Sequence, residues 1–226
     1  MSDHILLINP NSSAATSAMM LSIAREAAAG STAVAVATAV RAPSMIVTEA
    51  ELAAAAEDVI EIGTAHRSDC KGIVVSAFGD PGLEELRRRV DIPVTGLCEA
   101  SMLEASTGGR RFGIATTTPL LIDAMVRRAE GLGLSDQLTG IRCTDSDPFS
   151  LTGNYDRLIL ALGKTVCACI ELDGAQAVII GGGPLGQAAD QLQAAFVTPI
   201  IAPIPCAIRR AIALGRATGK SRIVPV

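Results

Sequence analysis

Aromatic residues are almost absent from this chain. Its 226 residues include no tryptophan, one tyrosine and four phenylalanines. Nucleic-acid bases would therefore find few aromatic side chains on which to stack. The chain is also acidic, with a formal net charge of −4, whereas proteins that bind nucleic acid rely on basic residues that contact phosphates. The basic clusters Arg87–Arg89 and Arg110–Arg111 are expected on a solvated helix or turn, so we expect no nucleic-acid partner.

Long hydrophobic runs are missing as well. The mean hydropathy is high at +0.41, but much of it comes from alanine. No run approaches the roughly 20 apolar residues that cross a bilayer. The first four residues lack the basic stretch of a secretory signal, and the apolar run Ile5–Ile8 is too short for a signal core. These features predict a cytoplasmic protein with no membrane partner.

Metal ligands are scarce. The chain has two histidines and six cysteines, of which only Cys167 and Cys169 lie close in sequence. Two residues apart on a helix, these thiols would point to different sides. The glycine run at 181–183 has neither the spacing of a dinucleotide-binding loop nor the lysine of a P-loop. The sequence therefore predicts no metal and no cofactor.

Short apolar runs alternate with helical patterns along the chain. This alternation predicts an α/β protein with parallel sheets flanked by helices and with sites at the carboxyl ends of the strands. The strands are predicted at Ile5–Ile8, Ala33–Ala37, Gly72–Val75, Val94–Leu97, Phe112–Ala115, Gly140–Arg142, Ala177–Ile180 and Pro199–Ile201. The helices are predicted at Thr16–Ala29, Thr48–Ser68, Leu83–Val90, Met102–Ala105, Pro119–Leu132, Asn154–Leu172, Gly186–Phe196 and Cys206–Thr218.

One structural unit occurs twice. A buried strand, a Gly/Pro loop, a helix and a strand entered through proline follow one another from Ile73 to Gly96 and again from Val178 to Ile201. This duplication predicts two pseudo-symmetric lobes that face each other across an interlobe cleft. The first lobe would comprise residues 1–97 and about 206–226, and the second would comprise residues 98–205.

Four loops after strands carry polar or glycine residues. Hydroxyls, amides and the free N–H groups of a following helix suit a carboxylate or carbonyl oxygen, although capping of that helix explains part of the same pattern. Glycines let a ligand approach the backbone closely. We expect substrate contacts from Asn9, Asn11, Ser12, Ala77, Phe78, Gly79, Thr116, Thr117, Thr118, Gly182, Gly183 and Pro184.

Three motifs carry a resemblance to a known family. They are N-P-N-S at Asn9–Ser12, F-G-D-P-G-L at Phe78–Leu83 and P-V-T-G-L-C-E-A at Pro93–Ala100. The chain resembles the aspartate/glutamate racemase superfamily over nearly its whole length, and is most similar to its hydantoin and allantoin racemases. The resemblance implies a cofactor-independent enzyme in which two cysteines move a proton to and from opposite faces of a small substrate.

Both of those cysteine positions differ here. By the resemblance, one cysteine precedes Phe78, where this chain has Ala77, and the other follows the strand of the second copy, where it has Gly182. An enzyme with altered chemistry would need another proton-transferring group, and the resemblance leaves Glu99, Asp80 and Ser76 as catalytic candidates, with Cys98 nearby. Each also has a structural explanation: a helix cap for Glu99, a turn before proline for Asp80, and a side chain directed away from the loop for Ser76.

Three readings of the function therefore stay open. The chain is a racemase- or isomerase-like enzyme for a small carboxylate, amide or hydantoin-type substrate, a related lyase or hydrolase, or a non-catalytic protein that binds such a molecule. We favour the enzyme. The alanine-rich helices also lead us to expect a homo-oligomer.

Overall fold

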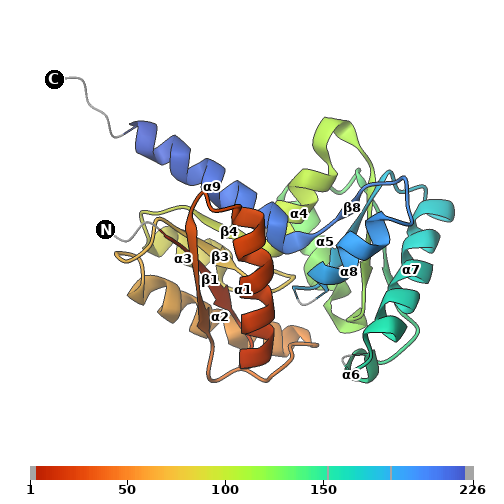
Figure 1. Ribbon diagram of the computed structural model, residues 1–226, viewed down its shortest axis with the longest axis horizontal. Coiled ribbons are helices and arrows are strands. Elements are labelled where there is room, and N and C mark those ends of the chain that lie inside the picture. The colour runs from red at the N-terminus through yellow and green to blue at the C-terminus, as the bar shows by residue number, and fades with distance from the viewer. Residues whose placement is uncertain (1–3, 152, 184, 222–226) are drawn as a thin grey trace. The chain divides into compact units, whose positions relative to one another are not determined.

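The protein divides into two compact units (Figure 1), seen in a computed structural model that describes residues 4–151, 153–183 and 185–221. The first unit comprises the described residues of Met1–Ile46, Ala50–Leu97 and Ile204–Val226. The second comprises those of Val47–Glu49 and Cys98–Pro203. Each unit holds one parallel four-stranded sheet with helices packed against it.

The sheet of the first unit has the strand order β2-β1-β3-β4. Its strands are β1 (His4–Asn9), β2 (Ala33–Thr38), β3 (Gly72–Val75) and β4 (Val94–Gly96). The helices of this unit are α1 (Ala14–Ala28), α2 (Glu49–Ala65), α3 (Leu83–Arg89) and α9 (Pro203–Ser221). On one face of the sheet, Ile73 and Val75 of β3 pack with Val59 of α2 and Leu86 of α3. Because this strand is buried on both faces, its sequence is apolar throughout rather than alternating.

The sheet of the second unit has the corresponding order β6-β5-β7-β8. Its strands are β5 (Phe112–Thr116), β6 (Leu138–Cys143), β7 (Ala177–Gly181) and β8 (Ile200–Ile201). Its helices are α4 (Leu97–Ala105), α5 (Ile122–Gly131), α6 (Pro148–Leu151), α7 (Tyr155–Glu171) and α8 (Gly186–Gln193), with 3₁₀ turns at Thr107–Gly109 and Pro119–Leu121. Leu162 and Val166 of α7 pack with Leu192 of α8 against Val178 and Ile180 of β7.

The predicted α/β class with two helix-flanked parallel sheets is confirmed. All eight predicted strands are found, each within two residues of its predicted ends. Sequence reasoning missed α6, a single turn whose start is capped by the Asp147 carboxylate accepting from the Ser150 N–H. It also began α9 three residues late, because the helix starts at Pro203, a residue well suited to the first turn. None of the helices described here is long and apolar enough to cross a membrane.

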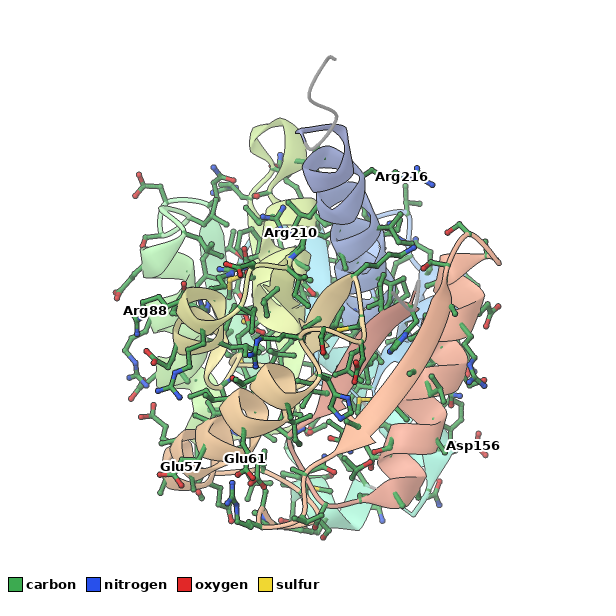
Figure 2. The ribbon with its side chains drawn as sticks, turned by 90° about the vertical axis from the view of Figure 1, so that its left-hand side faces the viewer. Glu57, Glu61, Arg88, Asp156, Arg210 and Arg216 are labelled. Carbon is green, nitrogen blue, oxygen red and sulfur yellow. The ribbon has the colours of Figure 1, made fainter. Side chains whose placement is uncertain are left out.

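The arginine run of α3 is a solvated helix face, as predicted. Arg88 and Arg89 both form ion pairs with Glu85 one turn earlier, and Figure 2 shows the exposed position of Arg88. These pairs lower the pKa of the Glu85 carboxyl, chiefly through the hydrogen bond from Arg88. Exposed pairs of this kind add little to stability.

Candidate active-site loops

The first candidate loop follows β1 and is organised by the Asn9 side chain. Asn9 is fully buried, and its Nδ2 lies within hydrogen-bond distance of Oδ1 of Asn11, the carbonyl of Ser13 and Oγ of Ser17. Its Oδ1 accepts from the Asn11 N–H, and the Ser17 hydroxyl in turn contacts that of Thr38. The Asn9 amide thus fixes the shape of the loop. Nδ2 of Asn11 and the exposed Ser12 hydroxyl have no partner among the described residues.

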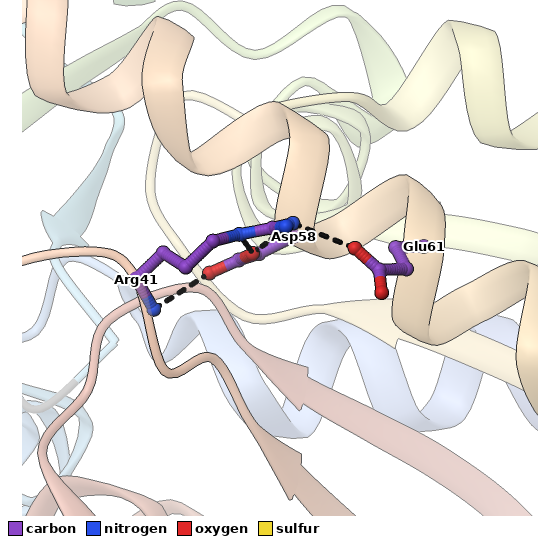
Figure 3. A network of polar contacts seen from close by, with 3 residues as sticks. All are labelled: Arg41, Asp58 and Glu61. Atoms are coloured by element: carbon purple, nitrogen blue, oxygen red, sulfur yellow. Dashed lines mark hydrogen bonds and ion pairs between the residues drawn. The ribbon is translucent and has the colours of Figure 1, made fainter.

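An ion-pair network supports the same loop from the side (Figure 3). Arg41 donates through its backbone N–H and its guanidinium to the buried Asp58 carboxylate, and its Nη2 lies 2.7 Å from Oε2 of Glu61. These contacts raise the pKa of Arg41, through Glu61 first and Asp58 second. They hold the segment after β2 against α2, and the carbonyl of Pro43 in that segment accepts the Ser12 N–H at 3.1 Å.

The second candidate loop follows β3 and turns tightly onto α3. The Ser76 N–H still pairs with the carbonyl of Ile8, while the Asp80 N–H bonds back to the carbonyl of Ala77 at 3.1 Å. Gly82 has a φ of +70°, and a β-carbon there would lie 2.8 Å from the carbonyl oxygen of Ala56. The turn therefore requires glycine at this position.

Three successive backbone donors of this turn are unused. The N–H groups of Ala77, Phe78 and Gly79 donate to no other residue that the structure describes. Buried or half-buried N–H groups are normally hydrogen-bonded, so three free neighbours indicate a place for an external acceptor. Successive N–H groups of this kind form a concave anion-binding arrangement.

The Asp80 carboxylate is buried in the same unit, with only 2% of the residue exposed. It packs directly on Cα of Gly96, the last residue of β4, where a β-carbon would overlap the carboxylate. Asp80 itself adopts a φ of +52°. The two motifs that suggested the family thus meet inside one unit, since Asp80 belongs to F-G-D-P-G-L and Gly96 to P-V-T-G-L-C-E-A. The sequence alone did not indicate that the lack of a side chain at Gly96 leaves space for the Asp80 carboxylate.

The Ser76 hydroxyl is poorly placed for proton transfer. It is 3% exposed and its Oγ lies 3.5 Å from the carbonyl of Val74, which is a long hydrogen bond. Its position agrees with the structural explanation that the sequence allowed. A second hydroxyl, Thr95 Oγ1, is buried without a partner among the described residues, and no sequence pattern indicated it.

The third candidate loop follows β5. Thr116 is buried and donates from Oγ1 to the carbonyl of Gly181 at 2.7 Å, so its hydroxyl ties β5 to β7. Thr118 Oγ1 lies 3.2 Å from Thr116 Oγ1. The Thr117 hydroxyl has no hydrogen-bond partner among the described residues and is available to a ligand. Of the three predicted threonines, Thr116 therefore serves to connect the two strands, and Thr117 has the hydroxyl that is least engaged in hydrogen bonds.

The fourth candidate loop follows β7. The Gly182 N–H bonds to the carbonyl of Ile180, and the Gly182 carbonyl accepts from Leu185 at 3.2 Å. The Leu185 side chain lies over Gly182, so that a β-carbon on this glycine would be 2.8 Å from Cδ1 of Leu185. The Gly183 N–H has no partner among the described residues. Pro184, which the sequence also predicted as a contact, lies outside them.

Glu99 and Cys98 lie in the first turn of α4 and are both buried. In the second unit, Cys143 ends β6 and lies beside Thr116 of β5, and Cys169 lies in α7. Burial raises the pKa of Cys169 to about 12 and raises that of Cys143 as well, so neither is a ready thiolate. Among the described residues, no cluster of acidic, histidine or cysteine side chains could hold a metal ion.

The four loops share one position in the fold and one kind of chemistry. Each follows the carboxyl end of a parallel strand, where ligands of α/β proteins bind. They offer free N–H groups, a free amide and free hydroxyls, which can stabilise a carboxylate or a developing oxyanion. Neither Ala77 nor Gly182 offers a side chain that exchanges protons.

Comparison with known proteins agrees with this description. A hydantoin racemase of Rhizobium meliloti is 30% identical over 96% of this chain and 92% of its own length. The solved allantoin racemase from Klebsiella pneumoniae superposes with a TM-score of 0.89 at 28% identity, covering 97% of this chain and 89% of that one. An allantoin racemase from Pseudomonas fluorescens gives a TM-score of 0.90 at 20% identity over 95% and 92% of the two chains, which shows the shared fold.

The sequence profile of one family spans nearly the whole chain. That family is described as Asp/Glu/Hydantoin racemase, and its profile matches residues 5–211. The match includes all four candidate loops, with Ala77 and Gly182. The resemblance drawn from the three motifs is thereby confirmed, and the chain belongs to the Asp/Glu/hydantoin racemase family.

Proposed function

We propose that this protein is a cofactor-independent, racemase- or isomerase-like enzyme that acts on a small carboxylate, amide or hydantoin-type substrate. The observation that carries the proposal is the row of free N–H groups at Ala77, Phe78 and Gly79. Removal of a proton next to a carbonyl leaves negative charge on the carbonyl oxygen. Preorganised N–H donors are the groups that stabilise such charge most effectively.

The remaining loop residues would bind and orient the substrate. Asn11, Ser12 and Thr117 supply the free side-chain donors, and the Gly183 N–H supplies another. Asn9 and Thr116 hold their loops in shape. Thr118 and Gly182 complete the two turns of the second unit.

Proton transfer needs a group other than the two thiols. A racemase requires a proton acceptor on one face of the α-carbon and a donor on the other. We propose the buried carboxylates of Asp80 and Glu99 as the candidates, because a carboxylate in a protected site can act as a general base. Ser76 is the weakest of the three predicted catalytic residues, because its hydroxyl faces a backbone carbonyl.

A specific observation favours a second candidate function. Leu185 covers Gly182, so this loop presents an apolar surface at the position of the family cysteine. Such a surface suits a protein that binds a carboxylate or cyclic amide without racemising it, or a lyase or hydrolase that works from one face. The free N–H groups would serve either activity.

Deuterium exchange separates these functions. The purified protein is incubated in D₂O with single enantiomers of hydantoins, allantoin and acidic amino acids, and the α-proton is followed by NMR together with optical rotation. With a racemase, the substrate exchanges its α-proton for deuterium and loses its optical rotation. With an enzyme that transfers the proton on one face only, the substrate exchanges the proton and keeps its optical rotation. Ligand-dependent thermal stabilisation without exchange would identify a binding protein and contradict the proposal.

Substitution of the carboxylates tests their role. Glu99→Gln and Asp80→Asn each preserve size while removing the basic oxygen, so the variant of the true base should lose about 10²–10⁴-fold in exchange rate. Unchanged exchange in both variants would remove both residues from the mechanism. We also propose that the protein is cytoplasmic and forms a homo-oligomer. Light scattering measured as the protein elutes from a size-exclusion column gives its mass in solution and tests the oligomeric state.

A further inference from the structure

A pocket in the second unit belongs to none of the four candidate loops. It has a volume of about 320 Å³ and lies between the carboxyl end of β6 and α7, along which it reaches Ala168. Arg142 and Cys143 line it from β6, Asp145 from the loop that follows, and Arg157 and Lys164 from α7. Its volume is at the lower end of the range for pockets that bind small molecules.

The positive charges of this pocket are only partly neutralised. Arg142 donates from Nε and Nη2 to the two carboxylate oxygens of Asp173, at 2.6 and 2.7 Å. This fork fixes the guanidinium and leaves its Nη1 without a partner among the described residues. The pair lowers the pKa of Asp173, chiefly through the hydrogen bond from Arg142.

The two cations on α7 have no carboxylate partner among the residues that the structure describes. Arg157 and Lys164 are seven residues apart, which places them on one side of the helix, and both line the pocket. Asp145 is the single carboxylate in the lining, so two unpaired cations face one unpaired anion. Such an arrangement favours a ligand that carries negative charge.

We propose that this pocket is a binding site for a small oxyanion, a phosphate or carboxylate head group on a compact molecule. A planar guanidinium held in place by Asp173 presents its free Nη1 in a fixed direction, and the flexible Lys164 ammonium closes on the anion as a point charge. Asp145 would accept a hydrogen bond from a hydroxyl or amino group on the same molecule. This site adds a ligand to the protein that is independent of the proposed reaction.

Cys143 provides a direct reporter of occupancy. Its thiol lines the pocket and is half-buried, and burial raises its pKa. At alkaline pH the thiol reacts slowly with iodoacetamide, and mass spectrometry of peptides reads each cysteine separately. Cys167, which is also half-buried but does not line the pocket, serves as the internal reference.

The experiment compares inorganic phosphate, acetate and sodium chloride at constant ionic strength, because screening alone changes the reactivity of charged surfaces. At about ten times its Kd, a bound anion should slow alkylation of Cys143 about tenfold and leave Cys167 unchanged. Protection by phosphate alone identifies a phosphate group as the ligand chemistry, and protection by acetate alone identifies a carboxylate. Equal reactivity of Cys143 in all three salts would overturn the proposal.

Matched variants locate the effect. Lys164→Gln and Arg157→Gln remove one pocket charge each, and each should raise the Kd of the protecting anion about tenfold. Arg216→Gln removes one exposed charge from α9 outside the pocket and serves as the control (Figure 2). Because all three side chains are exposed, the variants should fold normally. Protection that is identical in wild type and both pocket variants would also contradict the proposal.

Discussion

Leu185 occupies the space that a side chain at Gly182 would need. A β-carbon at Gly182 would lie 2.8 Å from Cδ1 and 3.0 Å from Cγ of Leu185, closer than carbon atoms pack. The resemblance to the family places a cysteine at this position, where this chain has glycine with the Leu185 side chain beside it. A thiol at this position therefore requires the Leu185 side chain to shift.

Gly182→Cys alone should destabilise the protein by about 1–3 kcal/mol, because the added side chain displaces Leu185 from its contacts. Gly182→Cys combined with Leu185→Ala should recover part of that loss, since the smaller side chain leaves room. Urea unfolding of the wild type, both single variants and the double variant measures the coupling between the two positions. Effects that simply add would show that Leu185 does not obstruct this site.

Restored thiols should increase proton exchange if the loops bind substrate as proposed. Ala77→Cys with Gly182→Cys and Leu185→Ala supplies a thiol in each loop of the family pattern, and the free N–H groups at Ala77, Phe78 and Gly79 remain to stabilise charge. We expect this triple variant to racemise a hydantoin faster than the wild type does. Ala77→Ser with Gly182→Ser and Leu185→Ala is the control, because a hydroxyl of similar size is a far weaker base. Equal activity of both triple variants would contradict the role assigned to the thiol positions.

Gly96→Ala should displace the Asp80 carboxylate. The added methyl group overlaps that carboxylate, which has no room to move because the residue is buried. We expect a loss of about 1–3 kcal/mol in stability together with loss of substrate binding. Gly131→Ala, in α5 with nothing near its added methyl group, should be neutral or stabilising by up to about 1 kcal/mol. Unimpaired binding by Gly96→Ala would exclude a role for Asp80 in the site.

Much of the fold could be predicted because its signals are local. The run Ile73–Val75 is apolar throughout and buried on both sides, and Asn154 caps α7 with its own side chain. The site was harder to predict because its decisive features depend on contacts between distant residues. The sequence shows Asn9, but only the structure shows that its amide is used within the loop.

The same holds for groups that sequence patterns did not mark. The packing of Leu185 on Gly182 occurs in a loop, where no periodicity in the sequence specifies the directions of the side chains. The pocket beside β6 combines Arg142 with Arg157 and Lys164, which belong to different elements. The motifs indicate which loops to consider, and the tertiary structure shows which of their groups have no partner among the described residues.

Asp58→Ala should loosen the first candidate loop without unfolding the protein. Loss of the carboxylate leaves Arg41 its pair with Glu61 but removes the acceptor of its backbone N–H, which lies at 3.1 Å (Figure 3). The segment that carries Pro43 should then open more often. Because the Pro43 carbonyl accepts the hydrogen bond from the Ser12 N–H, that N–H should exchange with solvent faster. Hydrogen exchange resolved at Ser12 measures this. Glu61→Gln, an exposed member of the same network, should leave that exchange nearly unchanged.

The ion pair between Arg142 and Asp173 should make stability depend on pH in the acid range. The pKa of Asp173 is held below its usual value of 3.8, so the folded state binds this proton less readily than the unfolded chain does. The stabilisation is therefore complete above the unfolded pKa and is lost as the pH falls through the folded pKa. Asp173→Asn should be less stable than the wild type at pH 7, and the difference should shrink steadily below about pH 4. Asp136→Asn, which removes an exposed carboxylate with no ion pair among the described residues, is the matched control. Urea unfolding at intervals from pH 7 to pH 3 measures both differences, and a gap that stays constant down to pH 3 would show that the pair does not contribute through the charge of Asp173.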